Sequence, residues 1–370
     1  MRFFFIFLIF IFSFANGISQ TMITPEIVTT LNEDIKENSG LANLDGEIWT
    51  HNDSGGADRL YQVNIENGEI IRDVKIDNAD NEDWEDLASD ENYVYIGDFG
   101  NNNGDRTDLR VYRISREELA NNDEVESETI EFSYSDQTSW EVNHNNHDFD
   151  CEAMICYQGH LYLFSKNWVD NQTRMYKLSN QPGTYIAEYQ ATFDVSCLIT
   201  GAEILPNSNS LILIGYNTNG GTFTWMFNGF ENDDFFEGDN TQFIWTLLTQ
   251  VEGICVDENN SVYISSENFS SFIDPTLYHF NFNDYITSVL TIDNDKILIY
   301  GHHGKVKISS ISGEFISGRV TVYNQTGQTV RQFQIHGAKR TTVMGNLPRG
   351  IYIVTLNSEY YGQIIKKIRL

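Results

Sequence analysis

The chain has 370 residues, of which 41% are hydrophobic and 13% aromatic, and it contains only five prolines. This composition can supply a large buried core, and it excludes a disordered tract. The formal net charge is −30 at pH 7. A body this acidic repels nucleic acid and anionic membranes and attracts cations, so we expect no nucleic-acid partner.

The charge is distributed unevenly along the chain. Residues 20–283 carry 48 acidic and 11 basic side chains, whereas residues 284–370 carry 5 acidic and 11 basic ones. Most of the scattered acidic residues are explained by solubility alone. The change of sign near residue 284 indicates two separately built parts.

Residues 1–17, MRFFFIFLIFIFSFANG, have the pattern of a secretory signal peptide. One basic residue precedes an apolar run, and the small residues Ala15 and Gly17 follow it at the spacing of a cleavage site. No apolar run reaches the roughly 20 residues of a membrane-spanning helix. We therefore expect a mature chain without a transmembrane segment.

A hairpin phrase recurs five times in the following part of the chain, each time as a strand, a polar turn and a returning strand. The copies read SGLANLDGEIWTHND from Ser39, EDLASDENYVYIGD from Glu85, EAMICYQGHLYLFSK from Glu152, EILPNSNSLILIGY from Glu203 and EGICVDENNSVYISS from Glu252. Further strands such as RLYQVNI and LRVYRIS follow each copy, which gives each unit the strand content of a small antiparallel sheet.

The spacing of the phrases predicts the architecture. Successive first residues lie 46, 67, 51 and 49 residues apart, close to the roughly 40 to 50 residues of a propeller blade. The longest interval contains an insertion with SREELANND, the segment nearest to a helix, at residues 115–123. We predict an all-β chain in which residues 20–283 form a five-bladed β-propeller. The early strand ITPEIVTTL would close the ring by completing the last blade.

Four cysteines, Cys151, Cys156, Cys197 and Cys255, are few for an exported chain of this length. Cys151 and Cys156 are five residues apart, so on one strand they face opposite sides and cannot bridge each other. We favour buried free cysteines over disulfides, which export would also permit.

Residues 287–370 predict a separate small β-sandwich, because short alternating strands such as KVKISS and GRVTVYNQTGQTV follow one another with turns between them. The segments VYNQTGQTV, LPRGIYIV and the terminal KKIRL resemble the type A sorting domain carried by cargo of the Bacteroidetes type IX secretion system. That resemblance implies the type IX machinery as a partner and export across the outer membrane, followed by release or surface attachment. The asparagine-proline start usual in such tails is absent, and an ordinary accessory sandwich stays an alternative.

In a propeller, the start of each blade's first strand and the end of its second strand meet at one mouth of the central channel. This places the first residues of the five phrases there: Ser39, Glu85, Glu152, Glu203 and Glu252. Crowded carboxylates cannot all stay ionised without compensation, and an oxygen-only ligand set favours Ca²⁺ over Zn²⁺. We therefore expect these five residues to bind Ca²⁺ in the channel. The alternative is that some of them bond to backbone N–H groups of neighbouring blades and the rest point into water.

The ends of the second strands supply further polar groups at the same mouth, listed by position as Asn52, Asp53, Asp98, Ser165, Lys166, Tyr216 and Ser265 to Glu267. His144 and His147 lie just upstream of Glu152, and either could act as a general base or bind zinc together with Asp148. A polar entry loop is the simpler interpretation of this stretch, although His147 is close enough to the mouth to be a catalytic candidate.

The order of short motifs around the ring is similar to that of the calcium-activated nucleotidase (apyrase) family of secreted propellers. The matching pieces are Ser39-Gly40-Leu41, Trp84-Glu85, Cys151-Glu152-Ala153 and Val251-Glu252-Gly253. The resemblance implies a central calcium that binds phosphate oxygens, with Asp53 or Asp98 activating water. The sequence departs from that family at LFSKNW, where Lys166 is the only cation available to hold a phosphate.

Two functions therefore remain open for a secreted or cell-surface protein. The first is a calcium-binding module for an extracellular ligand or glycan, with Trp168, Phe269 and Phe272 available for stacking. The alternative is a calcium-dependent phosphohydrolase at the propeller mouth. The sequence contains no Gly-rich phosphate loop, no Gly-x-Ser-x-Gly elbow and no His-Glu-x-x-His helix motif, which leaves the familiar hydrolase chemistries unsupported.

Overall fold

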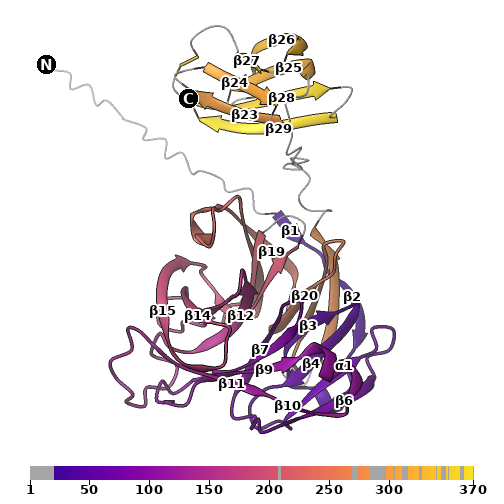
Figure 1. Ribbon diagram of the computed structural model, residues 1–370, viewed down its shortest axis with the longest axis vertical. Helices are drawn as coiled ribbons and strands as arrows, with labels where there is room; N and C mark the ends of the chain where they lie inside the picture. The colour runs from indigo at the N-terminus through magenta and orange to yellow at the C-terminus, as the bar shows by residue number, and fades with distance from the viewer. Residues whose placement is uncertain are drawn as a thin grey trace, which may run out of the picture. The chain divides into compact units, whose positions relative to one another are not determined.

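The computed structural model consists of two compact units, Met1–Phe282 and Asn283–Leu370 (Figure 1). The structure describes residues 21–206, 210–268 and 274–282 of the first unit, and 297–302, 305–310, 316–324, 327–338, 340–342, 347–348, 350–358 and 362–369 of the second. The predicted signal peptide, residues 1–17, lies outside these ranges. Within them, no helix is long and apolar enough to cross a membrane.

The first unit is built from antiparallel sets of four strands, as the repeated hairpins predict. The first set contains β3 (Asn38–Leu44), β4 (Glu47–Asn52), β5 (Arg59–Val63) and β6 (Ile70–Asp77), and the second contains β7 (Trp84–Ser89), β8 (Tyr93–Asp98), β9 (Arg110–Ser115) and β11 (Glu128–Tyr134). The third set contains β12 (Cys151–Tyr157), β13 (His160–Ser165), β14 (Gln172–Ser179) and β15 (Gly183–Asp194), and the fourth contains β16 (Leu198–Leu205), β17 (Ser210–Tyr216), β18 (Gly221–Asn228) and β19 (Asp239–Leu248). The fifth and last set contains β20 (Val251–Val256), β21 (Ser261–Ser266), β22 (Thr276–Asn281) and β2 (Glu26–Thr30).

The last set is completed by a strand from the start of the chain. β2 pairs antiparallel with β22, with Ile27 opposite Tyr278, so the predicted closure by ITPEIVTTL is confirmed. Leu31 follows β2, donates its backbone N–H to the carbonyl of Pro275 at 2.8 Å and is buried. Its side chain packs in one cluster with Leu277 and Val63, which joins the last set to the first.

The first strands of the sets form a ring. β3 contacts β7, β7 contacts β12, β12 contacts β16, β16 contacts β20, and β20 contacts β3. Figure 1 shows β3, β7, β12 and β20 toward the middle of the unit and β2, β6 and β15 toward its outside. Large side chains fill the space between neighbouring sets, as Trp49 and Leu60 do against Trp84 and Val94. The chain is thus all-β and its first unit is propeller-like.

Three parallel pairings join segments at the outer edges of the sets. β1 (Thr21–Ile23) pairs with β19, and β10 (Glu124–Glu126) pairs with β6. β11 pairs with β15, which merges two neighbouring sets into one eight-stranded sheet. The longest interval between phrases contains helix α1 (Arg116–Asn121), which lies within SREELANND, the segment named as nearest to a helix. Its N-cap Ser115 accepts from the N–H of Glu118. Two short 3₁₀ helices, Glu33–Ile35 and Phe235–Glu237, complete the elements.

The second unit has two sheets. One contains β23 (Ile297–His302), β24 (Lys305–Ser310) and β27 (Arg340–Thr342), and the other contains β25 (Ile316–Asn324), β26 (Thr329–Ala338), β28 (Ile351–Ser358) and β29 (Gly362–Arg369). Buried residues of both sheets share one hydrophobic core, in which Ile308 of the first packs with Val322 and Val354 of the second.

All four cysteines lie among the described residues and are free, and Cys156 alone is partly exposed. The preference for unpaired, largely buried cysteines is confirmed.

Candidate functional site

Four of the five residues predicted to open the phrases lie at irregularities where the first strands begin. The pairing shifts between Trp84 and Asp86, and Glu85 is the residue left out. Glu152 is left out in the same way between Cys151 and Ala153. Such a bulge adds one residue to a strand and re-aims its side chain. Ser39 and Glu252 lie in the corresponding irregularities of β3 and β20.

The fourth strand has a different residue at this position. Its irregularity lies between Ile199 and Gly201, so the counterpart of Glu85 is Thr200, whereas Glu203 pairs with Ile212 further along the strand. The prediction that Glu203 opens the fourth phrase at the mouth is therefore wrong by three residues, because Thr200 has that position. A bulge carries no sequence mark of its own, and the glutamates of the other phrases made Glu203 the apparent match. Burial raises the pKa of Glu203 to about 7.

The two hydroxyl residues of this ring join neighbouring strands. Ser39 Oγ donates to the backbone carbonyl of Glu85 at 2.5 Å, and Thr200 Oγ1 donates to that of Val251 at 2.6 Å. The predicted ligand Ser39 thus holds β3 against β7 through its side chain. The hydroxyl groups donate to backbone carbonyls, which differs from the alternative considered for the ring, bonding to backbone N–H groups.

Three carboxylates converge at one side of the mouth. Asp53, Asp83 and Glu85 each offer an oxygen within 4.8 Å of the others. Glu85 is only 3% exposed, and no donor or counter-ion among the described residues bonds to its carboxylate. Asp83 was missed from the sequence because it comes from the loop before β7. The sequence feature that could have indicated Asp83 is the acidic stretch DNADNEDWED that contains it. This stretch does not have the residue pattern of an EF-hand calcium loop.

The electrostatics of this cluster favour a bound cation. Burial, together with the nearby charge of Asp53, raises the pKa of Asp83 to about 7. Burial and the charge of Glu152 raise the pKa of Glu85 well above its ordinary value. Asp53 accepts from the N–H of Ser54, but the described residues give the side chains of Asp83 and Glu85 no hydrogen-bond donor. A cation would recover the solvation that these two carboxylates lose on burial.

Gly100 forms part of the wall behind the cluster. A Cβ on this residue would lie 2.1 Å from Glu85 Oε1 and 2.5 Å from Asp83 Oδ2. The absence of a side chain at Gly100 is what lets these two carboxylates lie over the backbone.

Lys166 pairs with a different carboxylate of the mouth. Its Nζ is 3.1 Å from Glu152 Oε1, and both side chains are buried. The same Nζ lies 5.4 Å from the centre of the Trp168 ring and 5.6 Å from that of Tyr216. Burial raises the pKa of Glu152 to about 8 even though Lys166 acts to lower it.

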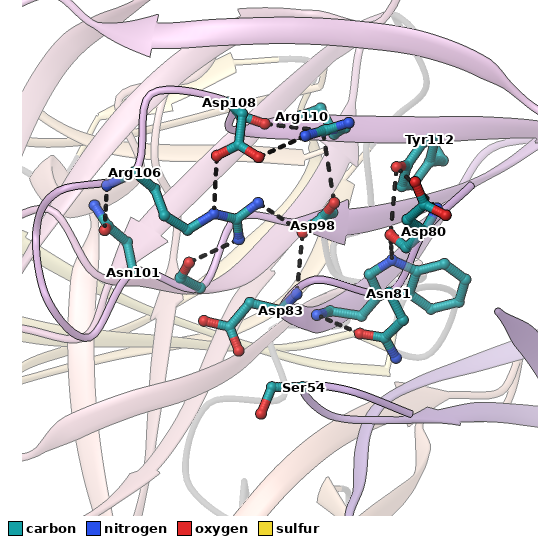
Figure 2. A network of polar contacts seen from close by, with 12 residues as sticks. Ser54, Asp80, Asn81, Asp83, Asp98, Asn101, Arg106, Asp108, Arg110 and Tyr112 are labelled. Atoms are coloured by element: carbon teal, nitrogen blue, oxygen red, sulfur yellow. Dashed lines mark hydrogen bonds and ion pairs between the residues drawn. The ribbon is translucent and has the colours of Figure 1, made fainter. Parts of the chain in front are cut away.

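Asp98 takes part in a separate network (Figure 2). Its Oδ1 accepts from Arg106 at 2.9 Å and from the backbone N–H of Asp83, and its Oδ2 lies 3.6 Å from Arg110 Nε. Arg106 also donates to the carbonyl of Gly100. Asp98, a predicted catalytic residue, is therefore ion-paired and holds the loop that carries Asp83.

His147 belongs to the wall of the mouth. Its Nδ1 accepts from the N–H of Phe149, and its Nε2 donates to the carbonyl of Asn102 at 3.1 Å. Both ring nitrogens thus bond to backbone, and Asp148 pairs with Arg174 at 2.5 Å. His144 Nδ1 contacts Asn103 at the surface. These contacts support the polar entry loop rather than a zinc site.

The remaining polar groups connect the mouth to the fourth and fifth sets. Gln250 donates to Glu267 at 2.8 Å and to the Tyr216 hydroxyl at 3.1 Å. Trp168 donates its indole N–H to Asp150. The other predicted stacking residues, Phe269 and Phe272, lie outside the described residues.

The comparison with protein families gives a match in the second unit. Residues 291–370 match the family of secretion system C-terminal sorting domains. This match indicates type IX sorting. The tail marks the chain as secreted or cell-surface cargo that crosses the outer membrane with the type IX machinery.

Solved structures similar to the chain include two that are remote in sequence. No curated protein matches the chain. Among solved structures, the PQQ-bound aldose sugar dehydrogenase from Streptomyces coelicolor is 8% identical with a TM-score of 0.40, covering 69% of this chain and 97% of that one. A chain of the mitotic checkpoint complex is 12% identical with a TM-score of 0.30, covering 65% and 61%.

Proposed function

We propose that this chain is an exported calcium-binding module: a five-bladed β-propeller that binds an extracellular ligand or glycan at its mouth, followed by a β-sandwich sorting tail. The signal peptide and the tail together would direct it to the cell surface or the medium. The closed ring of first strands supports five blades, and the core shared by two sheets supports the sandwich.

The observation that carries the calcium proposal is the buried carboxylate of Glu85 beside Asp53 and Asp83. The three residues supply oxygen ligands only, which suits Ca²⁺ and disfavours Zn²⁺. Their mutual proximity within 4.8 Å fits a single ion. Lys166 and Arg106 act on these three carboxylates without forming an ion pair with them, so an ion there would supply the direct positive contact.

The binding function is better supported than the phosphohydrolase that the nucleotidase resemblance implies. A phosphate needs free cationic groups, but Lys166 is paired with Glu152. The predicted water-activating Asp98 is paired with Arg106. Five further carboxylates around the cluster, namely Glu152, Glu252, Asp150, Glu267 and Glu37, would repel an anionic substrate.

The test is the calcium content and melting temperature of the purified full chain, with and without chelator. We expect one calcium per chain and a higher melting temperature with calcium, because a ligand at 100 times its Kd stabilises the folded state by about 2.7 kcal/mol. Glu85→Gln should abolish both effects, whereas Glu47→Gln, at an exposed position, should change neither.

Phosphate release from nucleotides and simple phosphoesters separates the two functions. Calcium without turnover is expected. Calcium-dependent turnover would favour the phosphohydrolase, and a chain that binds no calcium would refute the metal site.

A further inference from the structure

Lys166 places one buried positive charge among the carboxylates of the mouth. Residue 166 directly follows the last residue of β13, and its side chain is only 8% exposed. The ion pair with Glu152 at 3.1 Å and the flanking rings of Trp168 and Tyr216 fix the position of its ammonium group. No other ammonium group of the described residues pairs with a mouth carboxylate.

The ammonium group also interacts electrostatically with carboxyl groups beyond its direct contacts. Its charge acts on six carboxyl groups, those of Asp53, Glu85, Asp150, Glu152, Glu252 and Glu267. These residues lie on or beside β4, β7, β12, β20 and β21, and Tyr216 adds β17. The direct contacts of the ammonium group agree with a position toward the axis of the ring, because Glu152 belongs to the first strand β12 and Tyr216 ends β17 of the next set.

The residues at the strand irregularities of the ring have two kinds of neighbours. Glu152 contacts Lys166, and Ser39 and Thr200 bond to neighbouring backbone. Among the described residues of the ring, Glu85 alone joins the group with Asp53 and Asp83, whose members come from the first and second sets. Of the five residues predicted to bind one central ion, Ser39 and Glu152 thus have other partners, and Glu203 lies further along its strand.

We propose that Lys166 occupies the axial cation position of the ring and thereby confines the mouth to one divalent ion, held off the axis by Asp53, Asp83 and Glu85. Lys166 is then a specificity-determining residue, which sets the number of ions bound. This inference rests on the proposed calcium site. A second ion on the axis is excluded because it would need the carboxylates that Lys166 neutralises and would be repelled by the ammonium group.

The experiment is a calorimetric titration of the chelator-treated full chain with calcium chloride. We expect one ion for the wild type and two for Lys166→Gln, because Glu152 and Glu252 then lack their cation. Lys166→Arg keeps the charge and should bind one. Lys177→Gln removes a lysine that pairs with Asp233 instead and should also bind one.

A folded Lys166→Gln protein that still binds one ion would overturn the inference and leave the proposed site intact, whereas a wild type without calcium would overturn both. If Lys166→Gln does not fold, Glu252→Gln in the wild-type background decides. We expect one ion with less than about tenfold change in Kd, which corresponds to 1.4 kcal/mol. A larger loss would make Glu252 a metal ligand and refute the axial role of Lys166.

Discussion

The carboxylate of Asp86 accepts a hydrogen bond from the backbone N–H of Met154 at 2.7 Å, so a residue of β7 holds the neighbouring strand β12. Its other oxygen accepts from the N–H of Leu87 at 2.8 Å, and the side chain is fully buried. Asp86, the residue after Glu85, therefore holds the first strands of the second and third sets together.

Replacing Asp86 by alanine should destabilise the protein by about 2–6 kcal/mol, because two buried N–H groups lose their acceptor at about 1–3 kcal/mol each. Urea denaturation measures this loss. Asp123→Ala removes an aspartate whose side chain is 92% exposed, and it should change the unfolding free energy by less than about 0.5 kcal/mol. Equal effects of the two substitutions would deny Asp86 this role.

Leu31→Ala tests the closure of the ring by the start of the chain. Leu31 is buried between the first and last sets, so the cavity should cost about 2–5 kcal/mol. Ile27→Ala is the matched control on β2, where the side chain is 67% exposed, and it should be nearly neutral. A neutral Leu31→Ala would show that β2 contributes little to closure.

Gly100→Ala should weaken calcium binding while leaving the fold intact. The new methyl group must displace Glu85 Oε1 and Asp83 Oδ2, the atoms it would meet, and both are ends of movable side chains. We expect at least a tenfold rise in the Kd for calcium, measured by calorimetry. Gly350→Ala meets only the Tyr352 ring at ordinary distance, 3.6 Å or more, and should bind calcium like the wild type.

Stability without calcium should fall as pH rises. The pKa of Asp83 is raised from 3.8 to about 7 and that of Glu152 from 4.5 to about 8. A carboxyl with a raised pKa binds its proton more tightly when folded, so its stabilisation is complete below the unfolded pKa and is lost as pH rises through the folded one. Calcium needs the ionised form, so its affinity should rise over the same interval.

Melting curves between about pH 5 and pH 8, with calcium or chelator, check both trends. The gain in melting temperature from calcium should be larger at the higher pH, and Asp83→Asn should reduce that difference. A gain independent of pH would contradict the participation of Asp83.

The sequence predicted the features that depend on local patterns. Turn residues between alternating strands indicated the hairpins, and the isolated strand around Ile27 indicated the closure. The site was predicted less well, because bulges decide which side chain enters the mouth. Thr200 and Asp86 take their positions from such irregularities, and Asp83 comes from a loop whose path depends on the Asp98–Arg106 pair.

The pairing of β2 with β22 joins the two ends of the first unit, and this has a consequence for how the protein is made. β2 is among the first segments to be synthesised, but its partner ends at Asn281. Until that point β2 has no partner and the final sheet lacks its outer strand, so ring closure must come late and requires a contact of long sequence separation. A chain that is truncated before β22 would carry an open strand edge, and such edges promote aggregation.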